Sequence, residues 1–241
     1  MKNRNAYAGR NVEHLFVNSI KDHPSVVSKI QKAFGIDNRL INAINTGIHA
    51  GKVDVKLEFA CGRNIDANIK AFKNMGFNQI TRTTIKNFCE KNGFGSETIS
   101  KLEQLSINKA RKITSFWIPE SEQEYIKSLI QPIAENIVKW SFSSQSSREI
   151  LVLYNRINNI MHIYTMKDVL KELDYSVSFT VRGNILIGKF ILIQRKGGNG
   201  VHSKDIPKDS LKHPGNNIQL KLKINPFIKD MSYIELCSYE I

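Results

Sequence analysis

The sequence has few cysteines and no long apolar run. Its three cysteines, Cys61, Cys89 and Cys237, lie far apart, and no pair has the Cys-x-x-Cys spacing of a zinc site. An odd and scattered set also gives no disulfide framework, and reduced thiols are typical of a cytoplasmic protein. No apolar stretch approaches the roughly 20 residues that cross a bilayer, and the first residues lack the apolar core of a signal peptide. We therefore expect a cytoplasmic protein that does not act at a membrane.

Acidic side chains are scarce relative to basic ones. The chain has 35 lysines and arginines against 22 aspartates and glutamates, which gives a formal net charge of +13. A positive excess of this size attracts polyanions, either nucleic acid or acidic lipid, and the simpler alternative is a basic protein that is merely soluble. The six histidines form no pair with metal-ligand spacing, and the Gly-Gly-Asn-Gly stretch at Gly197 lacks the Lys-Ser/Thr of a phosphate-binding loop. Composition thus favours a polyanionic partner, and the Gly197 stretch implies no ATP site.

Proline is too sparse to mark a linker, so we expect one domain over residues 1–241. Apolar spacing predicts N-terminal helices in 1–50, including one over Leu40–Ile48, and a hairpin with a following loop in 51–80. Residues 81–145 have mostly helical patterns, including a helix over 121–140 that starts with a capping box at Ser121 and Glu124. Residues 146–241 alternate or run apolar as strands do. The predicted fold class is α/β, with a central mixed sheet flanked by helices.

The hairpin carries charged groups on one face. In the first strand, "VDVKLEF", Asp54, Lys56 and Glu58 point away from the apolar set; in the second, "ANIKAF", Asn68 and Lys70 do. A turn centred near Gly62 pairs residue 54 with residue 70. Asp54, Asn68 and Lys70 are therefore predicted to converge.

These three side chains suit metal-dependent cleavage of a phosphodiester. A carboxylate and an amide oxygen can hold Mg²⁺, and an ammonium can position water and stabilise developing negative charge. A simpler interpretation is an exposed ion pair between Asp54 and Lys70. A rival assignment uses Asp54-Val55-Lys56 as the acid-x-lysine triplet, with Asp37 as the leading acid.

Three stretches, "NIDANIKAFKNMGFNQI", "ILIQRKGGNG" and "NNIQLKLKINP", resemble the small type II restriction endonucleases of the HinP and MspI group. This group is a branch of the PD-(D/E)xK nuclease superfamily, and the resemblance covers most of the chain. In that pattern Asp54 matches the leading acid and Asn68-Ile69-Lys70 the triplet. Asn68 departs from the superfamily acid but fits the subgroup.

The resemblance implies Mg²⁺-dependent cutting of double-stranded DNA at a short palindrome, with 5′-phosphate and 3′-hydroxyl ends. It implies a four-base-pair target with a central CG, such as GCGC, and a cognate DNA methyltransferase in the same cell. Metal ligands would be Asp54 and Asn68, with Glu13 on the opening helix as a helper and Glu58 as a weaker candidate.

Two loops supply candidate DNA contacts. After the second hairpin strand come Asn78, Gln79, Thr81 and Arg82, and amide and guanidinium groups can pair with adenine and guanine edges. The late loop offers Gln194, Arg195, Lys196 and Asn199, beside glycines that permit close backbone approach. With the resemblance, Gln194 or Arg195 is expected at a base and Lys196 at a phosphate.

A second class of function stays open on the sequence alone. A non-catalytic, basic DNA-binding or regulatory protein could use the 121–140 helix to read DNA and keep the hairpin as structure. Metal-dependent digestion of DNA distinguishes the two.

Overall fold

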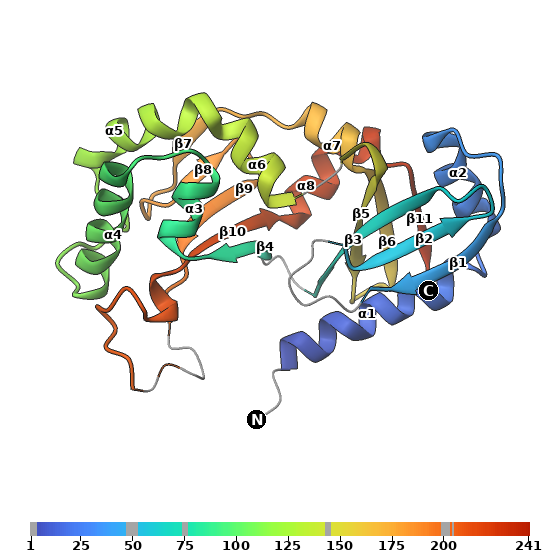
Figure 1. The fold of residues 1–241 in the computed structure, drawn as a ribbon, viewed down its shortest axis with the longest axis horizontal. Coiled ribbons are helices and arrows are strands. Elements are labelled where there is room, and N and C mark those ends of the chain that lie inside the picture. Colours follow the sequence, from blue (N-terminus) through green and yellow to red (C-terminus); the bar gives the residue numbers. More distant parts are fainter. Residues whose placement is uncertain (1–3, 47–52, 74–76, 143–145, 199–202, 204) are drawn as a thin grey trace. The chain divides into compact units, whose positions relative to one another are not determined.

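The chain divides into two compact units, each built from separate stretches of sequence. A computed structural model describes residues 4–46, 53–73, 77–142, 146–198, 203 and 205–241 (Figure 1). Unit 1 comprises residues 1–78, 143–173 and 224–241, and unit 2 comprises 79–142 and 174–223. The sequence blocks predicted above do not coincide with these units. That residues 1–241 form a single domain stays a prediction.

Unit 1 contains a six-stranded mixed sheet in the order β1-β2-β3-β5-β6-β11 (Figure 1). All neighbouring strands are antiparallel except β3 and β5, which are parallel. The strands are β1 (Leu40–Asn45), β2 (Val55–Phe59), β3 (Asn64–Phe72), β5 (Glu149–Asn155), β6 (Ile160–Thr165) and β11 (Cys237–Glu240).

Helices cover both faces of the unit 1 sheet. On one face, α1 (Arg4–Ile20) and α2 (Pro24–Phe34) bury Phe16 and Ile30 against the apolar residues of β2 and β3. Gly35 ends α2 with a left-handed φ of 59°. The opposite face receives α7 (Met166–Glu172) and α8 (Ile224–Asp230), where the rings of Tyr164 and Phe227 lie 5.3 Å apart. Short 3₁₀ turns lie at Ser146–Arg148 and Ser232–Ile234.

The helix predicted over Leu40–Ile48 is wrong. Residues Leu40–Asn45 form β1, an edge strand that pairs with β2 from Leu40↔Phe59 to Asn45↔Val55. The apolar residues Leu40, Ile41 and Ile44 fit a helical spacing, but the pairing with β2 supplies backbone hydrogen bonds that a short isolated helix cannot match.

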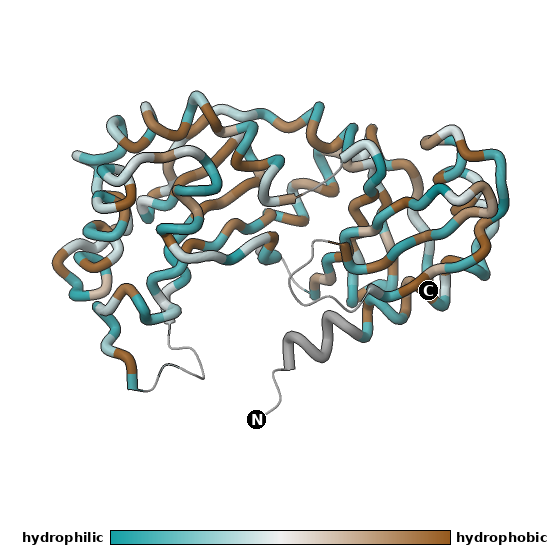
Figure 2. Tube along the Cα trace, viewed as in Figure 1, coloured by the Kyte–Doolittle hydropathy of each residue, from teal (hydrophilic) through white to brown (hydrophobic). Residues whose placement is uncertain are grey.

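Unit 2 contains a five-stranded sheet in the order β4-β10-β9-β8-β7. Its strands are β4 (Phe77–Thr83), β10 (Ile218–Lys223), β9 (Ile191–Arg195), β8 (Ile185–Ile187) and β7 (Val177–Phe179). One face is fully buried through Ile193, Leu220 and Leu222. Figure 2 shows β8 and most of β9 coloured hydrophobic, as a buried sheet requires. The α/β class with a mixed sheet flanked by helices is confirmed, and the strands divide between two sheets.

The helices of unit 2 are α3 (Ile85–Lys91), α4 (Ser96–Ala110), α5 (Glu120–Ile130) and α6 (Ala134–Phe142). The predicted 121–140 helix is interrupted by a 3₁₀ turn at Gln131–Ile133, which contains Pro132, and another 3₁₀ turn spans Pro214–Asn216. The capping box is wrong, because Pro119 is the N-cap and Ser121 lies inside the helix. No helix in the described ranges has the length and apolar character needed to cross a membrane.

Candidate active site

The hairpin of β2 and β3 sets the register of the candidate site. Its paired residues run from Val55↔Ala67 to Glu58↔Asn64. Continued by one residue, this register brings Asp54 level with Asn68, so the predicted pairing of residue 54 with residue 70 is wrong. The turn is centred one residue earlier than Gly62, which moves the pairing by two positions. Because side chains alternate with period two, the shift leaves the same residues on the same face.

Asp54 and Lys70 contact each other directly. The Asp54 Oδ2 atom accepts a hydrogen bond from the backbone N–H of Ile69 at 2.6 Å and one from Lys70 Nζ at 3.3 Å. Lys70 Nζ also donates to the Ile69 carbonyl at 3.1 Å. The Asp54 side chain is 22% exposed and that of Lys70 is 18% exposed. The pair is therefore held firmly by backbone groups yet remains accessible to a substrate.

Asn68 lies on the same strand face as Lys70, two residues away, and is 5% exposed. Farther along this face β3 presents Asp66, whose register partners are Lys56 on β2 and Glu149 on β5. These strands thus gather alternating charges beside Asp54, whereas the continuation of the face on β5 is the buried pair Leu151 and Leu153. The site lies where the helix-covered part of the face gives way to polar side chains.

Sequence reasoning missed Asp66. Within the described residues its Oδ1 atom is buried without a hydrogen-bond partner. Burial raises the pKa of the Asp66 carboxyl, and the neighbouring Glu149 raises it further, while Lys56 and Arg148 act in the opposite direction. The alternation of Asp66, Asn68 and Lys70 in "IDANIK" was the signal that could have placed it on this face.

Glu13, the predicted helper, is positioned by a different contact. Its Oε2 atom accepts a hydrogen bond from Asn45 Nδ2 at 2.8 Å. Asn45 is the register partner of Val55, whose side chain points to the α1 face, opposite to that of Asp54. Glu58 does share the Asp54 face, but it is four residues along the strand, or roughly 13 Å away. The structure brings neither glutamate into contact with Asp54.

The rival assignment requires Asp37 and Asp54 to lie together, but the structure places them far apart. Asp37 is exposed in the connection between α2 and β1, just before Leu40. Leu40 pairs with Phe59, at the turn end of the hairpin, whereas Asp54 lies beyond the opposite end of β2. Asp37 and Asp54 are therefore at opposite ends of the sheet.

The donor set near Asp54 fits a hard cation such as Mg²⁺. In the described part of the chain, both hydrogen bonds to the Asp54 carboxylate fall on Oδ2, which leaves Oδ1 for a cation. The Asn68 amide supplies another oxygen of the type that Mg²⁺ accepts, and this ion usually retains several waters. The described residues hold no group of three or more His, Cys, Asp or Glu side chains suited to a metal.

The predicted contacts on β4 point in two directions. Gln79 is exposed, and its Oε1 atom accepts a hydrogen bond from Gln219 Nε2 on β10 at 2.7 Å. By alternation Thr81 shares the Gln79 side, while Asn78 and Arg82 lie on the other. Asn78, which belongs to unit 1, donates from Nδ2 to the Ala71 carbonyl at 2.7 Å.

The predicted contacts at the end of β9 also alternate. Gln194 pairs with Gln219, whereas Arg195 pairs with Ile218 on the opposite face. Arg195 donates from Nε to Asn216 Oδ1 at 2.8 Å, and burial lowers the pKa of its guanidinium.

Lys196 follows directly, with Nζ 3.4 Å from the Gly197 carbonyl. Gly197 and Gly198 both have φ of 66°, a region that glycine enters without strain. Asn199 lies outside the described residues. Sequence reasoning missed Gln219 and Asn216, the partners of two predicted contacts.

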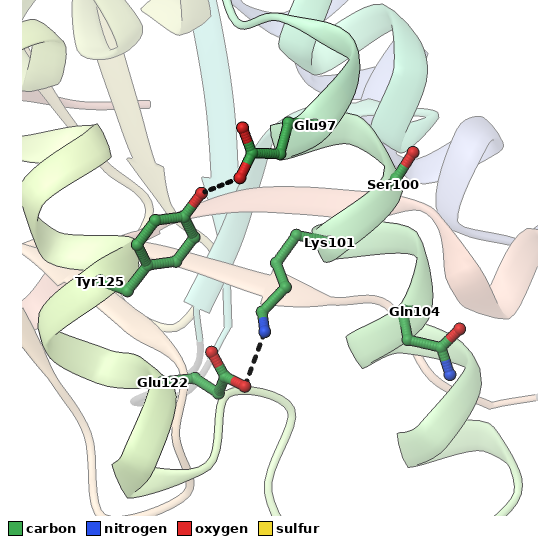
Figure 3. Close-up of a pocket in the computed structure, with 6 residues that line it drawn as sticks. All are labelled: Glu97, Ser100, Lys101, Gln104, Glu122 and Tyr125. Atoms are coloured by element: carbon green, nitrogen blue, oxygen red, sulfur yellow. Dashed lines mark hydrogen bonds and ion pairs between the residues drawn. The ribbon is translucent and has the colours of Figure 1, made fainter.

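A separate hollow of about 510 Å³ lies between α4 and α5 in unit 2 (Figure 3). Lys101 Nζ is 2.7 Å from Glu122 Oε1, and the Tyr125 hydroxyl donates to Glu97 at 3.3 Å. Its charged groups thus satisfy one another, and it contains none of the predicted catalytic residues. The lining residues are Glu97, Ser100, Lys101, Gln104, Glu122 and Tyr125.

Comparison with known proteins finds similarity in structure but none in sequence. No family model and no curated protein matches the sequence. Among solved structures, the restriction endonuclease MspI in complex with its cognate DNA is similar to this chain, with a TM-score of 0.49 and 13% sequence identity. The match covers 87% of this chain and 82% of that chain.

Proposed function

We propose that this chain is a type II restriction endonuclease of the HinP and MspI kind, which cuts double-stranded DNA with the help of Mg²⁺ and leaves 5′-phosphate ends. The observation that carries the proposal is the contact between Asp54 and Lys70, with Asn68 on the same strand face. A carboxylate, an amide oxygen and an ammonium in this arrangement can hold a cation beside a phosphate and receive the charge that builds up during attack.

In the proposed reaction each side chain has a separate task. Asp54 is fixed by the Ile69 N–H and by Lys70, so its Oδ1 atom keeps one direction toward a ligand. Lys70 keeps an N–H for a water or a phosphate oxygen, because an ammonium has three donors and two point to Asp54 and Ile69. Asn68 would add a neutral oxygen to the cation site. Bound Mg²⁺ would supply positive charge to the phosphate and make a bound water more acidic.

DNA binding in this proposal follows from charge and from polar side chains at two strand ends. The net charge of +13 favours binding to the negatively charged phosphate backbone of DNA. Gln79, Gln194 and Arg195 are proposed to read bases, with Thr81, Arg82 and Asn78 as further contacts, and Lys196 is proposed to contact phosphate. The proposed target is a CG-centred tetranucleotide such as GCGC. A cognate DNA methyltransferase would protect the DNA of the same cell.

Digestion of unmethylated phage DNA tests the proposal. Discrete fragments that appear only with Mg²⁺ would support it, and sequencing of the fragment ends would identify the site and the overhang. Fragment ends without a common sequence would contradict site-specific cleavage. An overhang other than CG would contradict the proposed target sequence. Tight binding without cutting in Mg²⁺ would instead favour the non-catalytic DNA-binding protein.

A further inference from the structure

A row of glutamine side chains crosses three neighbouring strands of the unit 2 sheet. It consists of Gln79 on β4, Gln219 on β10 and Gln194 on β9, and we call it the glutamine row. Gln219 joins its members, because it donates to Gln79 and is the register partner of Gln194. Gln79 is exposed and Gln219 is only 8% exposed. The row therefore has an outer amide supported by an inner one.

The hydrogen bond from Gln219 fixes the direction of the Gln79 amide. A glutamine amide has a carbonyl that accepts and an NH₂ that donates, and a freely rotating amide can offer either. Gln219 Nε2 donates to Gln79 Oε1 at 2.7 Å, so the carbonyl of Gln79 turns inward. Its Nε2 atom, on the other branch of the amide, is left to donate outward.

A fixed donor distinguishes bases that a free amide does not. In the major groove, guanine presents two acceptors, N7 and O6, whereas adenine presents one acceptor and one donor. A free glutamine pairs with adenine by using both its groups. A glutamine whose carbonyl is already engaged matches the acceptor-only edge of guanine better.

We propose that Gln219 is a positioning residue that makes Gln79 a hydrogen-bond donor toward DNA and thereby selects guanine over adenine at the base pair that Gln79 faces. This inference rests on the proposed function for its DNA partner, but it concerns recognition and not cleavage. Gln219 itself is too buried to reach a base edge, so its effect passes through Gln79.

Two substitutions of Gln219 separate orientation from packing. Gln219→Met keeps a side chain of similar length and removes the hydrogen bond. Gln219→Glu replaces the donor with an acceptor, so that Gln79 must turn, donate its NH₂ inward and present its carbonyl outward. Gln104→Glu is the matched control, because Gln104 also donates to a neighbouring amide, Asn108 at 2.8 Å, and the change adds the same charge to unit 2.

The experiment first selects bound duplexes from a randomised DNA pool with the wild-type protein, without Mg²⁺. Affinities are then measured for the selected duplex and for duplexes in which each guanine is replaced in turn by adenine or by 7-deazaguanine, which lacks N7. We expect one position where Gln219→Met lowers the guanine-to-adenine affinity ratio about tenfold. Gln219→Glu should lower that ratio further or invert it, and Gln104→Glu should leave it unchanged.

With 7-deazaguanine at this position, the duplex should bind the wild type more weakly than the guanine duplex does. Gln219→Glu should bind the two duplexes about equally well. Thermal unfolding midpoints of all variants identify any that fail to fold, and Gln79→Ala then repeats the test without touching the buried position. The inference is overturned if folded Gln219→Met keeps the wild-type ratio at every position, or if Gln79→Ala does so where Gln219→Met fails to fold. It is also overturned if the selected pool has no common sequence. A protein that selects DNA but never cuts it contradicts the proposed cleavage alone.

Discussion

The two sheets of this protein carry different kinds of polar side chain on their accessible faces. In unit 1, the face beside Asp54 holds acidic and basic side chains, with Lys56 and Lys70 interleaved among the carboxyl groups. In unit 2, the glutamine row is made of neutral amides, two of which, Gln219 and Gln79, are hydrogen-bonded to each other. The charged cluster beside Asp54 and the uncharged glutamine row thus lie on different sheets of one chain.

A basic protein can combine chemistry with recognition by using charged groups for one and amides for the other. Charges stabilise a cation and a reacting phosphate, but their attraction depends little on direction. Amides have no net charge, and their hydrogen bonds depend on which atom points outward. A surface that distinguishes bases therefore gains from amides, and a surface that cleaves a phosphodiester gains from ions.

The largest effect is expected from removing a charge in unit 1. Asp54→Ala and Lys70→Ala should each lower turnover by about a hundredfold or more, because such electrostatic groups stabilise the transition state more than the bound substrate. Affinity for cognate DNA should stay within a few-fold of wild type. Single-turnover cleavage and a binding titration in Ca²⁺ measure the two separately.

Lys56→Ala is the matched control, since Lys56 lies on the same face, two residues from Asp54 and opposite Asp66. It should retain cutting. If Lys56→Ala abolishes cleavage while Lys70→Ala cuts normally, the triplet Asp54-Val55-Lys56 takes the place of Asn68-Ile69-Lys70.

The next effect is expected from adding a charge where unit 1 has an amide. Asn68→Asp places a carboxylate beside Asp54 and should tighten the cation site. We expect the Mg²⁺ concentration for half-maximal cutting to fall about tenfold, equivalent to about 1.4 kcal/mol. A titration of cleavage rate against Mg²⁺ measures it. An unchanged midpoint would show that residue 68 does not ligate the metal.

A smaller effect concerns the charge at the end of β9. Log affinity for DNA should fall linearly with log salt, and Lys196→Ala should reduce the slope by about 1 and weaken cognate and random DNA equally. Arg195→Ala should weaken cognate DNA more than random DNA. Equal losses for both duplexes would assign Arg195 to a phosphate.

The smallest effect is one of stability. Burial raises the pKa of Asp66 in the folded protein above its ordinary value of 3.8. The contribution of Asp66 to the free energy of unfolding is therefore fully present below pH 3.8 and is lost as the pH rises through the folded pKa. Asp66→Asn has no charge to bury and should therefore raise the urea midpoint at pH 7. The two midpoints should converge below pH 3.8. A gain that is constant with pH would show that the charge of Asp66 is not its cause.

Local patterns predicted the strands of the site well. The alternation in "VDVKLEF" and "ANIKAF" gave β2 and β3 and the faces of Asp54, Asn68 and Lys70. The register was wrong by two residues, because the position of the turn depends on backbone geometry near Cys61 and Gly62 that the pattern does not specify. Period two made the error harmless for the site.

Long-range contacts were beyond the sequence patterns. Gln219 and Gln79 are 140 residues apart in the sequence, so nothing local indicates that their amides meet. The same holds for Asp66, whose pKa is raised by burial in the folded sheet and further by Glu149 in β5. The segment Leu40–Asn45 became a strand only because β2 offers it a partner. In each case, tertiary structure decided what local spacing left open.

The parallel pairing of β3 with β5 has a consequence for biosynthesis. These neighbours are separated by all the chain between residues 72 and 149, and β11, at the end of the chain, pairs with β6. At roughly 5–20 residues per second, a ribosome delivers β5 many seconds after β3. Until then β2 and β3 have at most the edge strand β1 beside them, without the central strand that completes their sheet. A nascent chain therefore carries Asp54 and Lys70 long before it has the finished sheet that holds them.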